Sequence, residues 1–179
     1  MQIDTPKSYA FWLMPRDEQA SQLQSLIHEL ANRYRTPSFI PHVTLCSGQW
    51  SRGSTELCSI AQAVAVEFKS LALATSGIGH IDRTFQYFYI AIHDQKFEAI
   101  AQSARALLQS ARTPKPCPHL SLMYSSDYGQ IDRAELAKDI QGLVPDTIAF
   151  DRIACVMPRN NDWSDIAGWQ ELGSYALAT

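Results

Sequence analysis

Two short segments of this sequence are nearly identical: residues 41–45 are PHVTL, and residues 118–122 are PHLSL. Each runs from a proline through alternating polar and apolar residues, which is typical of a half-buried β-strand. Because successive side chains of a strand point to opposite faces, the histidine and the hydroxyl residue two positions later share one face. The sequence therefore predicts two matching strands, each with one polar face and one buried face.

The residues around these two segments repeat with nearly equal spacing. Tyr9 precedes His42 by 33 positions, and Tyr87 precedes His119 by 32. Each histidine is also followed, 29 positions later, by a residue of a further apolar segment. The spacing predicts an internal duplication in which both histidines occupy the same position of a repeated unit.

Hydrophobic periodicity predicts the same order of elements in both halves: strand, helix, strand, helix, strand. Asp94 and Asp132 precede helical patterns in the second half and are expected to be N-caps. The expected strands of the first half are residues 9–14, 39–46 and 68–76, and those of the second half are residues 87–92, 119–124 and 148–157.

We therefore expect an α+β fold that is duplicated and bilobal, with two antiparallel sheets facing a central cleft and helices outside. Residues 1–179 would form this single bilobal domain, with pseudo-repeats at about residues 8–78 and 84–157 and a closing strand at about 169–176. Residues 76–84, between the halves, are expected to be a hairpin or a loop that covers the cleft.

Composition narrows the class of protein. Hydrophobic residues make up 46% of the 179 residues and charged residues 18%, which suits one globular unit with a substantial core, and we expect a monomer. The formal charge of −3 argues against a protein that binds long nucleic acid through many phosphate contacts. The first six residues lack the pattern of a signal peptide, and no apolar run could span a bilayer, so we expect a cytoplasmic protein without membrane contact.

The duplication brings two imidazoles and two hydroxyls to one cleft: His42, Thr44, His119 and Ser121. This set suits displacement at phosphorus, because one imidazole can take a proton from the attacking group while the other gives one to the leaving oxygen. The hydroxyls can donate to phosphate oxygens as charge develops there. No metal or other cofactor is required. The sequence leaves open which histidine is the base and which is the acid.

The two motifs resemble those of the 2H phosphoesterase superfamily, which is defined by two His-x-Thr/Ser motifs in a duplicated, bilobal α+β fold. Within it, the chain is most similar to cyclic phosphodiesterases of the plant and yeast type. That resemblance is carried by residues 9–15 (YAFWLMP), by residues 39–44 (FIPHVT) and by the short total length.

This resemblance implies a small nucleotide cyclic phosphate as the substrate. The implied reaction is hydrolysis of a nucleoside 2′,3′-cyclic phosphate, or of the ADP-ribose 1″,2″-cyclic phosphate left by tRNA splicing, to a phosphomonoester. It also implies that Tyr124 and Trp12 lie near the substrate, in addition to the four motif residues, whereas Trp163 and Trp169 are interpreted as packing residues. Whether the product is the 2′- or the 3′-phosphate stays open.

Three alternatives remain. The chain could process RNA ends, as 2′-5′ RNA ligases or RNA cyclic phosphodiesterases do, or it could bind nucleotides without turnover. A zinc site is the third alternative, because His42 with Cys46 and Cys117 with His119 have even spacings that would direct all four side chains to the cleft. Against it, the four cysteines lack zinc-ribbon spacing and are expected to be reduced and mostly buried.

Overall fold

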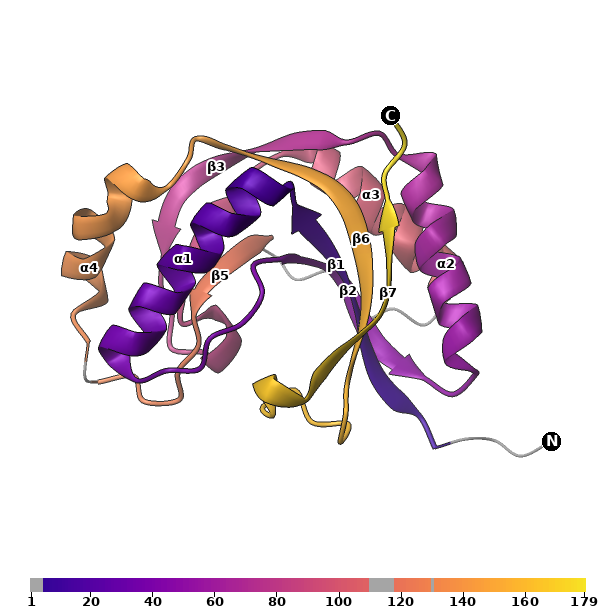
Figure 1. Cartoon of the computed structure of the whole chain (residues 1–179), viewed down its shortest axis with the longest axis horizontal. Helices are drawn as coiled ribbons and strands as arrows, with labels where there is room; N and C mark the ends of the chain where they lie inside the picture. Colours follow the sequence, from indigo (N-terminus) through magenta and orange to yellow (C-terminus); the bar gives the residue numbers. More distant parts are fainter. Residues whose placement is uncertain (1–4, 110–117, 130) are drawn as a thin grey trace.

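The computed structural model describes residues 5–109, 118–129 and 131–179. Over these residues, strands and helices alternate in the predicted order (Figure 1). The α-helices and strands are β1 (Lys7–Pro15), α1 (Asp17–Tyr34), β2 (Val43–Trp50), α2 (Ser54–Glu67), β3 (Leu71–Gly79), β4 (Phe88–Ile92), α3 (Gln95–Leu108), β5 (His119–Met123), α4 (Arg133–Ile140), β6 (Thr147–Pro158) and β7 (Trp169–Ala176). Three short 3₁₀ turns complete them: η1 (Thr84–Gln86), η2 (Gln141–Leu143) and η3 (Ile166–Gly168).

All the described strands belong to one antiparallel sheet, with the order β1-β2-β5-β4-β3-β6-β7. The prediction of two separate sheets is therefore wrong. The cause is β6, which arches across the molecule in Figure 1. Its first residues, 147–150, pair with β3, and residues 150–156 pair with β1, so one strand joins both halves and closes the sheet on itself.

The helices lie outside the sheet, α1 and α4 on one flank and α2 and α3 on the other (Figure 1). Helix α1, from the first half, packs on β5 of the second half, and α3 packs in return on β2. The pairings among β1 to β6 are unchanged when β1, β2 and β3 exchange places with β4, β5 and β6, whereas the pairing of β6 with β7 has no counterpart. A duplicated chain would give such a pattern, and the duplication itself stays a prediction.

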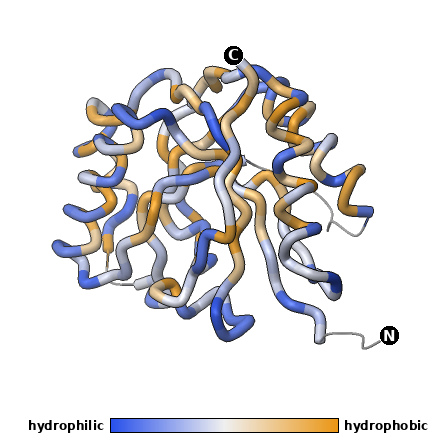
Figure 2. Tube along the Cα trace, turned by 45° about the vertical axis from the view of Figure 1, so that its right-hand side comes forward, coloured by the Kyte–Doolittle hydropathy of each residue, from blue (hydrophilic) through white to orange (hydrophobic). Residues whose placement is uncertain are grey.

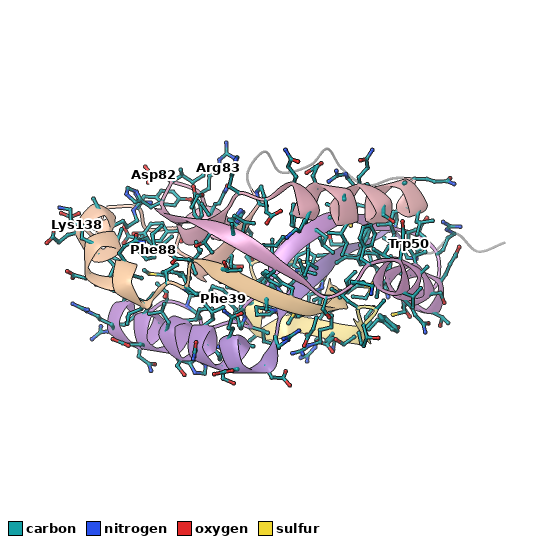
Figure 3. All side chains as sticks on the ribbon, turned by 90° about the horizontal axis from the view of Figure 1, so that it is seen from above. Phe39, Trp50, Asp82, Arg83, Phe88 and Lys138 are labelled. Atoms are coloured by element: carbon teal, nitrogen blue, oxygen red, sulfur yellow. The ribbon has the colours of Figure 1, made fainter. Side chains whose placement is uncertain are left out.

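The main hydrophobic core lies between the sheet and the helices. Figure 2 shows hydrophobic and hydrophilic residues alternating along the helical turns, and the predicted stripe of α1, which includes Leu23, Leu26, Ile27 and Leu30, is buried. The core runs the length of the molecule, since Figure 3 shows Trp50 near α2 and Phe88 at the opposite end, and both belong to one cluster. A smaller cluster on the other face of the sheet includes Ala10, Trp12 and Val156.

Local signals in the sequence located most element boundaries. The side chains of Asp94 and Asp132 accept hydrogen bonds from the backbone at the starts of α3 and α4, so both predicted N-caps are confirmed. Strand β2, in contrast, begins at Val43 and not at residue 39, because Pro41 has no N–H to donate to a ladder. The region 76–84 is also not a simple loop, since β3 continues to Gly79. No helix of the described chain is long and apolar enough to cross a membrane.

Candidate active site

The two motifs meet where β2 and β5 pair, through Val43 opposite Leu120. These are the residues between the histidine and the hydroxyl residue of each motif, and both are fully buried. One side of β2 pairs with β1, and one side of β5 pairs with β4. The backbone N–H and C=O groups on the other side of each motif strand are left to pair with the other motif strand. The motif strands therefore lie side by side in one sheet, and do not face each other across a cleft as predicted.

All four motif side chains reach one cavity of about 290 Å³. Tyr124 and Trp12, the two residues implied by the family resemblance, line it as well. The complete lining is Ser8, Ala10, Trp12, His42, Thr44, Ser47, Gly48, Gln49, Phe85, His119, Ser121, Tyr124, Trp163 and Trp169. The structure thus brings together every candidate site residue of the sequence.

His42 is held in a fixed orientation on two sides. Its Nδ1 lies 2.7 Å from the carbonyl oxygen of Ile40. Because a carbonyl oxygen can only accept, Nδ1 carries a proton, and Nε2 is the nitrogen that can exchange one. The ring is stacked on Trp12, with centroids 3.7 Å apart and planes 14° apart, and Trp169 meets it edge-on. His42 is only 6% exposed, so the ring has little freedom to turn away from the cavity.

The second motif is contacted by η1, the turn between β3 and β4. Gln86 Nε2 lies 3.3 Å from His119 Nδ1, and the Ser121 hydroxyl donates to the carbonyl oxygen of Phe85 at 3.0 Å. The ring of Tyr89 on β4 is 5.1 Å from that of His119. Sequence reasoning missed Phe85 and Gln86, since these contacts exist only once the connection between the halves has folded back over β5.

Aromatic rings form much of the remaining wall. Trp163 and Trp169, interpreted as packing residues, do pack against Trp12, yet they also line the cavity. Tyr124 is stacked on Phe39 at 3.8 Å, and burial raises the pKa of its hydroxyl above the usual value of 10.0, while a hydrogen bond with Ser121 opposes the shift. Tyr124 therefore stays protonated at neutral pH and can serve only as a neutral hydrogen-bonding group.

Of the zinc ligands considered as an alternative, Cys46 does not reach the cavity. A β-bulge between Phe11 and Trp12 shifts the register of β2, so that Cys46 pairs with Phe11 and joins the main core instead of the cavity. Burial raises the pKa of its thiol to about 12, which disfavours the thiolate that zinc requires. Cys117 lies outside the described residues. Within the described ranges, no group of three or more His, Cys, Asp or Glu could hold a metal ion.

The described lining of the cavity contains no lysine, arginine, aspartate or glutamate. A charged ligand group in a largely enclosed site needs charged or hydrogen-bonding partners, because an unpaired buried charge is costly. Here the partners on hand are the two imidazoles and the hydroxyls of Thr44, Ser121 and Tyr124. The set is sufficient for one anionic group positioned between the two motifs.

Solved structures of similar fold cover nearly the whole chain. TT0787 of Thermus thermophilus matches 95% of this chain and 97% of its own with a TM-score of 0.63 and 15% identity. Escherichia coli LigT complexed with 3′-AMP matches 98% of this chain and 100% of its own with a TM-score of 0.62 and 15% identity. No curated protein sequence matches the chain.

These similarities and the two motifs define the fold as that of the 2H phosphoesterases. The chain belongs to the family described as "Cyclic phosphodiesterase-like protein", whose model matches residues 7–169. The matched segment contains both motifs and every cavity-lining residue.

Proposed function

We propose that the protein hydrolyses a cyclic phosphodiester to a phosphomonoester without a metal ion, using His42 and His119 as acid and base. The observation that carries this proposal is the convergence of both motifs on one cavity. Among the described residues that line this cavity, the ionisable groups are the two imidazoles and a buried tyrosine. Two imidazoles that differ in protonation are a sufficient proton donor and acceptor for this reaction.

In the proposed reaction, a water molecule attacks phosphorus while one imidazole takes its proton. The bond between phosphorus and one ring oxygen breaks, and the other imidazole gives that oxygen a proton, so the number of protons on the two histidines is unchanged. Thr44 donates a hydrogen bond to one non-bridging phosphate oxygen. Ser121 donates to another once its hydroxyl has turned from the Phe85 carbonyl oxygen towards the bound phosphate. Both phosphate oxygens gain negative charge in the transition state. A positioned donor of this kind contributes about 10²–10³ in rate.

The substrate class is a small cyclic phosphate: a nucleoside 2′,3′-cyclic phosphate or ADP-ribose 1″,2″-cyclic phosphate. Ligand sites commonly measure about 300–1,000 Å³, and this cavity of about 290 Å³ lies at the lower end. E. coli LigT, which shares the fold, has been crystallised in complex with 3′-AMP, ATP and NADP+. The small volume of the cavity supports a mononucleotide-sized ligand over an RNA end.

The test compares wild type, His42→Ala, His119→Ala and His28→Ala with 2′,3′-cyclic nucleotides in excess EDTA, following phosphomonoester formation. His28 is exposed on α1 and serves as the matched control. General acid–base groups contribute about 10²–10⁴ in rate, so we expect losses of that size in the two motif variants and none in the control. Activity of His119→Ala equal to wild type would contradict the mechanism. Loss of wild-type activity in EDTA would contradict the absence of a metal.

The same assay separates the alternatives. An oligonucleotide that ends in a 2′,3′-cyclic phosphate should be a poorer substrate, by kcat/KM, than the cyclic mononucleotide. A strong preference for the oligonucleotide would favour RNA-end processing. Tight binding of nucleoside monophosphates by a wild-type protein that turns over none of these compounds would identify a binding module.

A further inference from the structure

We propose that the part of the cavity beside the two motifs, along the β1–β2 ladder, is a nucleobase subsite formed by Ser8, Gln49 and Trp163. This inference rests on the proposed function and narrows it, because it selects a nucleoside 2′,3′-cyclic phosphate over ADP-ribose 1″,2″-cyclic phosphate. None of these three residues is marked by the motifs. Each lines the same cavity as the two histidines.

The floor of the cavity is the ladder between β1 and β2. Its successive pairs are Trp12 with Thr44, Ala10 with Ser47, and Ser8 with Gln49. The side chains along this ladder change from the hydroxyl of Thr44, through the small Ala10 and Ser47, to the polar pair of Ser8 and Gln49. Small residues in the middle leave room for a ring above the sheet.

The polar pair at the end is pre-arranged. Gln49 Nε2 donates to Ser8 Oγ at 2.9 Å, and the backbone N–H of Ser8 donates to Asn161 Oδ1. Ser8 is only 6% exposed. Because its oxygen already accepts from Gln49, its hydroxyl proton is directed elsewhere, and Gln49 keeps its carbonyl oxygen as an acceptor. A donor beside an acceptor complements the edge of a nucleobase, where an amino or imino N–H adjoins a ring nitrogen or carbonyl.

Trp163 forms the side of this subsite. It lies in the connection between β6 and β7, two residues after Asn161, which ties that connection to Ser8. Its carbonyl oxygen accepts from Trp169 Nε1 at 3.0 Å, so both ends of the short segment are fixed. Stacking of a base on an aromatic ring strengthens binding by about 5–150-fold. Trp12 has one face against His42, whereas Trp163 is partly exposed.

The floor is long enough for one nucleoside. Ser8 is four residues from Trp12, which is about 13 Å at about 3.3 Å per strand residue. A ligand that lies along the floor with its cyclic phosphate at the Thr44 end therefore brings its base towards Ser8 and Gln49.

The charge of the ligand is the reason to expect a nucleobase, and not a diphosphate, in this subsite. Beyond its cyclic phosphate, ADP-ribose 1″,2″-cyclic phosphate carries a diphosphate with two further negative charges, whereas a nucleobase is neutral. The described residues that line the cavity include no lysine or arginine. Placing a diphosphate there would leave its charges without partners, at a cost that a neutral base does not incur.

The experiment measures kcat/KM of wild type, Gln49→Leu and Trp163→Ala for 2′,3′-cyclic AMP, 2′,3′-cyclic CMP and the base-free analogue 1-O-methylribose 2,3-cyclic phosphate. Gln22→Leu, an exposed glutamine of α1, is the matched control. We expect wild type and the control to prefer the nucleotides over the base-free analogue by about tenfold or more. Each subsite variant should lose most of that preference, through KM, since a lost base contact of about 1–3 kcal/mol corresponds to about 5–150-fold.

The outcomes separate this inference from the proposed function. A wild type that hydrolyses the nucleotides and the base-free analogue equally well, or subsite variants that keep the full preference, would overturn the subsite while leaving the hydrolysis intact. A wild type that prefers ADP-ribose 1″,2″-cyclic phosphate would also overturn it. If no cyclic phosphate is turned over, the proposed function fails. Calorimetric binding of 3′-AMP then tests the nucleobase subsite by itself. Weaker binding by Gln49→Leu than by Gln22→Leu supports the subsite, and equal binding refutes it.

Discussion

Replacing Trp12 by leucine tests whether this ring positions His42 or contacts the substrate. The ring is 4% exposed, is stacked on His42 at 3.7 Å and meets Trp169 edge-on at 5.3 Å. Each aromatic pair is worth about 0.5–1.5 kcal/mol beyond its buried area, and removing a buried aromatic side chain costs about 3–5 kcal/mol when alanine replaces it. Leucine refills part of the space, so we expect the free energy of unfolding to fall by about 2–4 kcal/mol.

The catalytic effect follows from the loss of the stacked face. Without the stacked face of Trp12, the His42 ring can tilt, and a displacement of about 1 Å of a reacting group costs about 10²-fold in rate. A positioning role predicts that kcat of Trp12→Leu falls by about that factor while KM changes by less than about threefold, because a positioning residue contributes to the transition state and not to substrate binding.

Steady-state kinetics and urea denaturation are measured on the same preparations. Trp12→Phe keeps a flat ring against His42 and should recover most of kcat. Trp50→Leu is the control for stability, because Trp50 is also 4% exposed but lies in the main core, away from the cavity. It should lose comparable stability and keep its kcat. A Trp12→Leu enzyme with unchanged kcat and a KM raised tenfold or more would refute the positioning role and show that the ring contacts substrate.

Three further predictions are independent of Trp12. The pH profile of kcat/KM should be bell-shaped, reporting one basic and one acidic imidazole, and a profile that only rises with pH would indicate a lone base. Burial raises the pKa of Cys46 from its usual 9.0 to about 12, so the folded protein should resist iodoacetamide at this residue at pH 8. The free energy of unfolding should fall above about pH 9, because there only the unfolded chain ionises this thiol. Replacing the N-cap Asp132 by alanine should lower the free energy of unfolding by about 0.5–2 kcal/mol in urea denaturation, and the exposed neighbour Asp139 should give a change near zero.

Local signals in the sequence were sufficient for most of the fold. The closing strand was predicted at about residues 169–176 and is found as Trp169–Ala176. Helix α3 follows from a capping aspartate and a buried stripe. Closure of the sheet was not predictable, since it depends on which edges meet over long distances in sequence.

Parts of the site depend on geometry that periodicity does not encode. The even spacing of His42 and Cys46 indicates a shared face only if the strand is regular, and the bulge beside Trp12 breaks that condition. Gln49 and Trp163 resemble ordinary surface or packing residues until β1, β2 and the connection after β6 are placed together. In each case the missing information is tertiary.

The pairing of Val43 with Leu120 is the link between the sequence motif and the chemistry. Extending this antiparallel register by one residue on each side predicts that His42 is opposite Ser121 and that Thr44 is opposite His119. Opposite residues are about 4.5–5.5 Å apart, whereas residues two apart on one strand are separated by about 6.6 Å. This register would give each histidine its nearest hydroxyl in the other motif and would place the two imidazoles at diagonal corners of the quartet. A phosphate held by both hydroxyls would lie between the imidazoles, as in-line displacement requires, so neither motif alone could supply the site.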